Sequence, residues 1–104
     1  MTEEQLRSVK NIKLEINRIE NALISNKGNS IAHQEYAELL QSRKEDLIKK
    51  KIEIEQYIST IKDAEIRLII SLKFIDLKSW GYIAKTLHYD RSTIYYKFKN
   101  FLKK

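Results

Sequence analysis

Four side chains with hydrogen-bonding groups lie close together near the end of the chain: Arg91, Ser92, Tyr95 and Tyr96. An arginine can donate two hydrogen bonds to one guanine, and a short hydroxyl side chain can contact a base edge. Arg91 and Tyr95 are four residues apart, so they would share one face of a helix. The chemistry that these residues suit is therefore noncovalent contact with the base edges of double-stranded DNA.

Each of these residues also has a simpler interpretation. Arg91 could contact a phosphate, or remain a solvated charge in the first turn of a helix. Tyr95 and Tyr96 are adjacent and lie about 100° apart around a helix, so both cannot occupy the centre of one buried face. We therefore expect one tyrosine to pack against the protein and at least one to contact DNA.

The excess positive charge lies in the second half of the chain. Residues 1–61 contain ten Lys and Arg and ten Asp and Glu, whereas residues 62–104 contain ten Lys and Arg and four acidic residues. The second half thus carries the whole formal net charge of +6, which is typical of contact with nucleic acid or another anionic surface. For any single lysine, a solvated charge is the alternative. The candidate phosphate contacts are Lys85, Thr93, Lys97, Lys99, Lys103 and Lys104.

The elements that must position these residues form a helix-turn-helix over residues 79–102. Ile83 and Ile94 supply apolar contact between the two helices, and Ala84 is small enough for close packing. His88 lies at the turn, where a left-handed backbone costs residues other than glycine roughly 1 kcal/mol. Short oxygen side chains at the start of the second helix can accept hydrogen bonds from its free N–H groups. They are Asp90, Ser92 and Thr93.

Another helix is predicted ahead of this motif, over Asp63–Leu77, where it would brace both motif helices. Trp80 should cover this helix as part of the core rather than stack on a base. Phe98 supplies an apolar anchor late in the last helix. The predicted buried stripe of the bracing helix is Ile66, Ile69, Ile70 and Phe74.

The first half predicts a long antiparallel helical hairpin. Its first helix, over residues 3–25, has a heptad spacing of apolar residues. Residues 25–30 are a cluster of helix breakers, and a second helix follows from about Ile31 to about Ser59. The chain is therefore expected to be all-α, with a hairpin over residues 1–61 and a three-helix module over residues 62–104.

This hairpin has two interpretations. It could be an oligomerisation arm that forms a homodimer, or a helical pair that covers only its own partner and the C-terminal module. The arm is favoured because a two-helix hairpin exposes apolar surface unless something else covers it. The predicted dimer seam is Ile12, Ile16, Ile19 and Ile54.

Several classes of protein do not fit the sequence. No Gly-rich phosphate loop, no cysteine nucleophile and no Ser–His spacing of a known catalytic motif is present, so an enzyme with a small-molecule substrate is not expected. His33 and His88 are far apart and there is no cysteine, so neither a metal site nor a cofactor is expected. The acidic N-terminus and the lack of a long apolar run argue against a membrane partner. The lack of cysteine fits a cytoplasmic location.

The C-terminal 40 or so residues resemble region 4 of sigma-70-type factors. Together with the helices ahead of it, the chain looks like the small phage and prophage activators of late genes, the ArpU-like family. The matching residues are Ile61, Asp63, Arg67, Leu72-Lys73-Phe74-Ile75, Ser79-Trp80, Ile83-Ala84-Lys85-Thr86-Leu87, Arg91, Thr93-Ile94 and Phe98.

The resemblance implies a function. In sigma region 4 the second motif helix contacts the promoter −35 element, and by position Arg91, Ser92, Tyr95 and Tyr96 would face DNA. Tyr95 and Tyr96 stand where sigma factors commonly have Arg and Gln, so a different target sequence is implied. No sigma region 2 is present, which favours an accessory regulator of transcription over a complete initiation factor.

Two other function classes stay open. A DNA-packaging recognition subunit also combines a helix-turn-helix with a helical oligomerisation segment, but it would form a ring. A protein–protein module could use the hairpin to hold a partner such as RNA polymerase without binding DNA. The basic second half favours the first class, a sequence-specific DNA-binding regulator of transcription.

Overall fold

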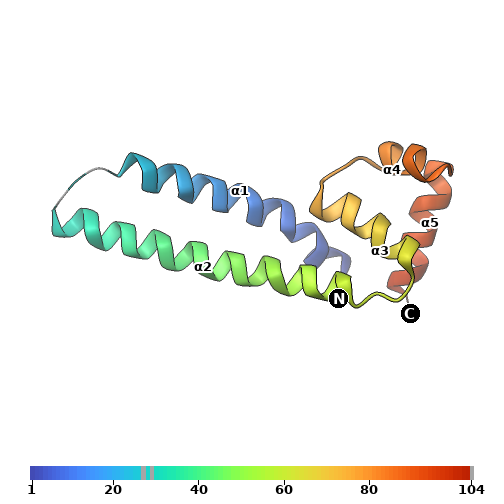
Figure 1. Ribbon diagram of the computed structural model, residues 1–104, viewed down its shortest axis with the longest axis horizontal. Helices are drawn as coiled ribbons and strands as arrows, with labels where there is room; N and C mark the ends of the chain where they lie inside the picture. The colour runs from blue at the N-terminus through green and yellow to red at the C-terminus, as the bar shows by residue number, and fades with distance from the viewer. Residues whose placement is uncertain (27, 29, 104) are drawn as a thin grey trace.

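A computed structural model of the protein describes residues 1–26, 28 and 30–103. Within that part of the chain every regular element is a helix, which confirms the predicted all-α class (Figure 1). A long helical pair extends from one side of a group of shorter helices, and the molecule measures 56 × 24 × 18 Å. The elements are α1 (Glu3–Ser25), α2 (Ile31–Ser59), α3 (Ala64–Ile70), the π-helical η1 (Ser71–Ile75), α4 (Trp80–Leu87) and α5 (Arg91–Leu102).

The first helix begins at a capping box. The Thr2 hydroxyl accepts a hydrogen bond from the Gln5 backbone N–H, and the Gln5 side chain accepts one from the Thr2 backbone N–H at 2.8 Å. Two of the free N–H groups at the helix start are thereby satisfied. Glu3 and Glu4 add negative charge in the first turn, where the helix dipole favours it.

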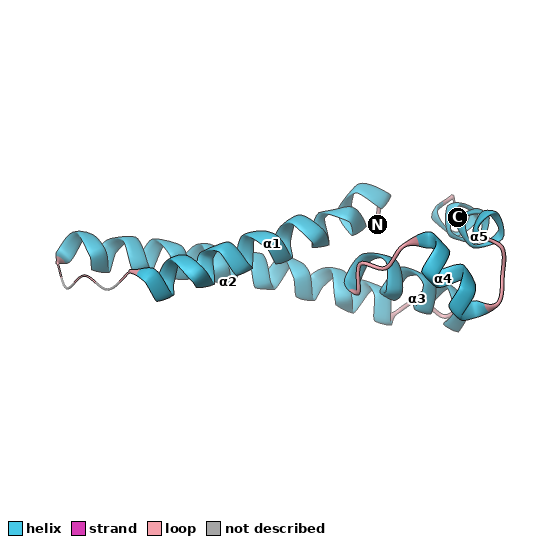
Figure 2. Cartoon of the chain, turned by 90° about the horizontal axis from the view of Figure 1, so that it is seen from above, coloured by secondary structure: helices cyan, strands magenta, loops and turns pink. Residues whose placement is uncertain are grey.

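The predicted heptad seam packs against α2 within one chain. The two helices lie side by side along most of their length in Figure 1, and their ribbons overlap when seen from above in Figure 2. Ion pairs also join them, from Arg43 to Glu15 at 3.1 Å and from Lys44 to Glu20 at 3.5 Å. The buried seam residues are Leu6, Val9, Ile12 and Ile19 from α1 and Leu47, Ile54 and Ile58 from α2.

This packing corrects the residues assigned to the dimer seam. Ile12, Ile19 and Ile54 are each no more than 7% exposed in the single chain, and Ile16 is half-buried against the same core. A second copy would find little of these side chains left to cover. They form the intrachain core because α1 and α2 bury their apolar stripes against each other. The homodimer itself stays a prediction.

The bracing helix is shorter than predicted and ends in a wider turn. The expectation was one helix over Asp63–Leu77, but α3 ends at Ile70 and five π-helical residues complete the element. The Asp76 N–H donates to the Ser71 carbonyl, a five-residue step that defines the π turn. Leu77 follows with a φ of 59° and redirects the chain towards α4. The predicted stripe is confirmed, with all four members buried: Ile66, Ile69, Ile70 and Phe74.

One hydrophobic core joins the hairpin to the helices that follow it. Leu6 and Val9 of α1 belong to the same buried cluster as Phe74 and Phe98. The Lys13 ammonium donates to the Ile75 carbonyl, which satisfies an acceptor where η1 ends. Lys27 and Asn29 of the predicted breaker cluster and the predicted phosphate contact Lys104 lie outside the described part. No helix that the structure describes is both long enough and apolar enough to cross a bilayer.

Candidate nucleic-acid interface

Helices α4 and α5 meet at the predicted turn. Ile83 and Ala84 of α4 are buried against Ile94 and Phe98 of α5, with Ile83, Ile94 and Phe98 completely covered. His88 adopts φ 62° and ψ 42°, the left-handed conformation expected at this position. The surrounding packing stabilises this strained backbone conformation, as does a hydrogen bond from the Tyr89 N–H to the Ala84 carbonyl at 2.9 Å.

The start of α5 differs in one detail from the prediction. Asp90 is the N-cap residue, but its side chain accepts no hydrogen bond from the helix. Its carboxylate therefore leaves the first-turn N–H groups of α5 without the expected partner. Such groups, with the helix dipole behind them, favour a nearby negative charge such as a phosphate.

The four residues assigned to base contact all lie on the exposed side of α5. Arg91, Ser92, Tyr95 and Tyr96 are exposed, while Ile94 on the other side is fully buried. A hollow of about 280 Å³ separates the starts of the two motif helices, and it is lined by Trp80, Arg91, Ser92 and Tyr95.

Tyr95 and Tyr96 have different surroundings, as expected for adjacent residues about 100° apart around a helix. Tyr95 meets Trp80 edge to face, with ring centroids 5.5 Å apart, and is 42% exposed. Tyr96 points outward and is 66% exposed. Trp80 also packs on Phe98 with centroids 5.4 Å apart, so it covers the core as predicted. Edge-to-face packing of this kind holds the Tyr95 ring in a fixed orientation.

Ion pairs change the expected role of two lysines. Lys97 pairs with Glu65 of α3 at 3.0 Å, and Lys99 pairs with Glu3 of α1 at 2.5 Å. Hydrogen bonds to these carboxylates raise the pKa of both ammonium groups above the ordinary lysine value. Each lysine joins α5 to another helix, so a phosphate would have to compete with a carboxylate already in place. Lys85 and Lys103 are exposed, and Thr93 is half-buried.

Glu65 is the centre of a small polar network that the sequence did not reveal. It accepts hydrogen bonds from Lys97 and from the Tyr89 hydroxyl, the latter at 2.9 Å. The hydrogen bond from Lys97, followed by that from Tyr89, lowers the pKa of the Glu65 carboxyl group. The hydrogen bond to Glu65 raises the pKa of the Tyr89 hydroxyl. The network joins α3, the motif turn and α5. Glu65 lies at least 24 residues from both of its partners, so no local spacing could have predicted the network.

Two further cations lie beside α4. The Lys73 ammonium is 4.8 Å from the centre of the Trp80 ring, and the Lys78 ammonium is 5.1 Å from the centre of the Tyr82 ring. Cation–π contacts hold both charges beside the N-terminal half of α4. The predicted phosphate contacts did not include either lysine, because only the turn at Leu77 brings this segment beside the motif.

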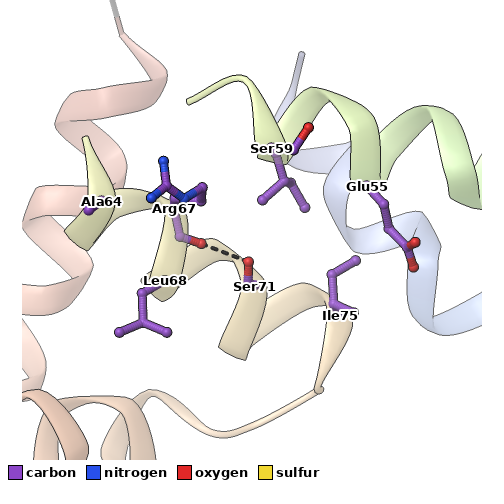
Figure 3. Close-up of a pocket in the computed structure, with 8 residues that line it drawn as sticks. Glu55, Ser59, Ala64, Arg67, Leu68, Ser71 and Ile75 are labelled. Atoms are coloured by element: carbon purple, nitrogen blue, oxygen red, sulfur yellow. Dashed lines mark hydrogen bonds between the residues drawn. The ribbon is translucent and has the colours of Figure 1, made fainter. Parts of the chain in front are cut away.

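A separate groove of about 450 Å³ lies between α2 and the α3–η1 element (Figure 3). Its polar groups already have structural partners. The Ser71 hydroxyl donates to the Arg67 carbonyl at 2.8 Å, Arg67 donates to the Ile61 carbonyl at 2.8 Å, and Glu55 pairs with Lys51. In the described part of the chain, no three His, Cys, Asp or Glu side chains cluster as metal ligands would.

Comparison with known families gives one match. The model of the family described as "Protein of unknown function (DUF1492)" matches residues 30–104. The chain belongs to this family. No curated protein and no solved structure matches the chain.

The part of the chain that the DUF1492 family covers begins at Ser30, the N-cap residue of α2. It therefore includes α2 together with α3, η1 and the two motif helices. The face of α5 described above lies entirely within the matched segment.

Proposed function

We propose that the protein binds specific sequences of double-stranded DNA and regulates transcription, as a phage or prophage regulator. The observation that carries this proposal is the exposed N-terminal half of α5. Arg91, Ser92 and Tyr96 project from a helix whose opposite side is fixed in the core. A recognition helix inserts its N-terminal residues into the major groove in this manner.

The charge around this helix supports contact with DNA. Arg91 makes no salt bridge with any residue in the described part of the chain, and its aliphatic stem passes close to Gly81 at the start of α4. Its guanidinium group is therefore available to donate two hydrogen bonds to guanine. Lys73 lies close enough to Arg91 for their charges to interact, and Lys78 and Lys85 add positive charge at α4. The resemblance to sigma region 4 supports the same assignment.

We also propose that the protein acts as a homodimer, through residues other than the predicted seam. Large apolar side chains remain exposed towards the loop end of the hairpin. In a homodimer the second copy would cover these side chains. They are Ile24, Ile31, Tyr36 and Leu39, each at least 50% exposed.

A protein-contacting module, with RNA polymerase as the partner, is the second candidate. The observation that favours it is the groove between α2 and α3, which is bordered by Leu68 with 44% of its surface exposed. Lys97 and Lys99 also form ion pairs with carboxylates of the same chain, which reduces the positive charge that α5 presents to DNA.

Selection of bound sequences from a random DNA pool tests the main proposal. A DNA-binding regulator should enrich a defined site, and its affinity for that site should fall as salt increases. A protein-contacting module should enrich no sequence. A mass measurement separates a dimer from the ring that a DNA-packaging subunit would form.

A further inference from the structure

A second positively charged feature lies away from the exposed face of α5. A pocket of about 360 Å³ separates α1 from the segment that joins η1 to α4. We call it the basic pocket. Its lining residues are Arg7, Lys10, Asn11, Lys73, Phe74, Leu77 and Lys78.

The charges of the basic pocket are only partly compensated. Arg7 pairs with Glu3, the carboxylate that also holds Lys99. Lys10, Lys73 and Lys78 form no salt bridge with a residue that the structure describes. Partial burial, followed by the charges of Arg7 and Arg91, holds the pKa of Lys73 below the ordinary lysine value. An anion in the pocket would relieve this repulsion.

The pocket is built by tertiary packing rather than by one flexible segment. Lys13 binds the Ile75 carbonyl and so fixes α1 against η1. The Lys78 N–H donates to the Leu72 carbonyl at 2.9 Å, and the positive φ of Leu77 shapes the turn between them. Basic residues from α1 and from the turn therefore face a common space, with the Asn11 side chain as an additional hydrogen-bonding group.

A continuous row of contacts leads from the basic pocket to the recognition face. Lys73 lines the pocket and lies over the Trp80 ring at 4.8 Å. Trp80 in turn contacts Tyr95 at 5.5 Å and shares the hollow at the helix starts with Arg91. Lys73 is also close enough to Arg91 for their charges to interact, so the pocket lies beside the exposed face of α5.

We propose that the basic pocket binds a backbone phosphate of the DNA whose bases α5 contacts, so that α1 forms part of the DNA-binding surface. This inference rests on the proposed function. It gives Lys10, Lys73 and Lys78 the role of positioning the protein on the duplex, because phosphate contacts fix orientation but carry no base information.

The test compares two double variants of the full chain with equal net charge. Lys10→Gln with Lys78→Gln removes two charges from the pocket, whereas Arg18→Gln with Lys49→Gln removes two exposed charges from the hairpin outside it. Affinity for the selected site is measured over a series of salt concentrations. The pocket variant should lose about one unit of the slope of log affinity against log salt, because the single phosphate in the pocket contributes roughly 0.9. The control variant should keep the wild-type slope.

The outcomes separate this proposal from the main one. If wild type and Arg91→Ala differ in sequence discrimination but the pocket variant keeps the wild-type slope, DNA binding stands and the pocket proposal is overturned. If wild type binds no DNA, both are overturned. Titration with inorganic phosphate, followed by the NMR signals of Asn11, distinguishes the source of the anion. Saturable binding of free phosphate with an unchanged DNA slope would show a small-anion site and overturn the role in DNA binding.

Discussion

At the scale of single residues, Arg91 and Lys103 should separate sequence recognition from positioning. Arg91 is exposed in the first turn of α5, and Lys103 is exposed at the end of the same helix. Arg91→Ala should cost about 1–3 kcal/mol on the selected site and reduce discrimination between sites. Lys103→Ala should weaken binding to all duplexes by a similar, smaller amount.

Affinities of both variants for selected and scrambled duplexes, at one salt concentration, measure this difference. Equal losses on the two duplexes for Arg91→Ala would make Arg91 a phosphate contact. The face of α5 assigned to base contact would then be wrong.

His88 tests the strain at the motif turn. Its side chain is exposed, so a substitution there changes the backbone preference with little loss of packing. Because φ is 62°, His88→Gly should raise the free energy of unfolding by up to about 1 kcal/mol. His88→Val should lower it by about 1–2 kcal/mol, since a β-branched residue tolerates positive φ poorly. Urea denaturation measures both values, and a more stable valine variant would contradict the assigned conformation.

At the scale of elements, the Glu65 network links α3 to the motif turn and α5. Hydrogen bonds from Lys97 and Tyr89 lower the pKa of Glu65 from its ordinary 4.5, so ionised Glu65 stabilises the folded state. This stabilisation is fully present above pH 4.5 and disappears as pH falls through the lowered pKa. Glu65→Gln should therefore unfold at a lower urea concentration than wild type at pH 7.

The difference between Glu65→Gln and wild type should shrink as the pH is lowered below the ordinary carboxyl pKa. Glu53→Gln is a suitable control, because Glu53 is an exposed carboxylate of α2 outside the network. A difference that is the same at pH 7 and at low pH would mean that the network does not contribute through its charge.

At the scale of the whole molecule, the charge distribution determines how DNA affinity responds to salt. With Lys97 and Lys99 paired, the remaining predicted phosphate contacts are Lys85, Lys103, Lys104 and the basic pocket, which would hold one phosphate. About four contacts per protomer give a slope of about −4 for log affinity against log salt. A titration over several salt concentrations measures it, and an affinity independent of salt would contradict DNA binding through phosphates.

Assembly is the second property of the whole molecule. Light scattering should find a homodimer, and Leu39→Lys should dissociate it without unfolding, because Leu39 is 66% exposed. Ile16→Lys should instead destabilise each chain, since Ile16 packs on the intrachain core. Circular dichroism distinguishes unfolding from dissociation. A wild-type monomer at micromolar concentration would reject the dimer.

The sequence alone determined the features that depend on neighbouring residues. The heptad spacing from Val9 to Leu23 and the breaker cluster after Ser25 predicted the hairpin, and the structure places its helices at the expected bounds. Local spacing also located the turn at His88 and the buried stripe from Ile66 to Phe74. These predictions succeeded because helical periodicity and turn conformation are set within a few residues.

Only the tertiary structure decided how distant side chains pair. The packing of α1 on α2 and η1 placed Ile12 in the interior of one chain, gave Lys99 a carboxylate from α1, and brought Arg7 beside Lys73. The seam of a self-covering hairpin and that of a dimer arm have the same heptad pattern, so the pattern could not separate them. Ion pairs and pockets depend on how whole helices are placed, and residues 96 positions apart leave no local trace of their contact.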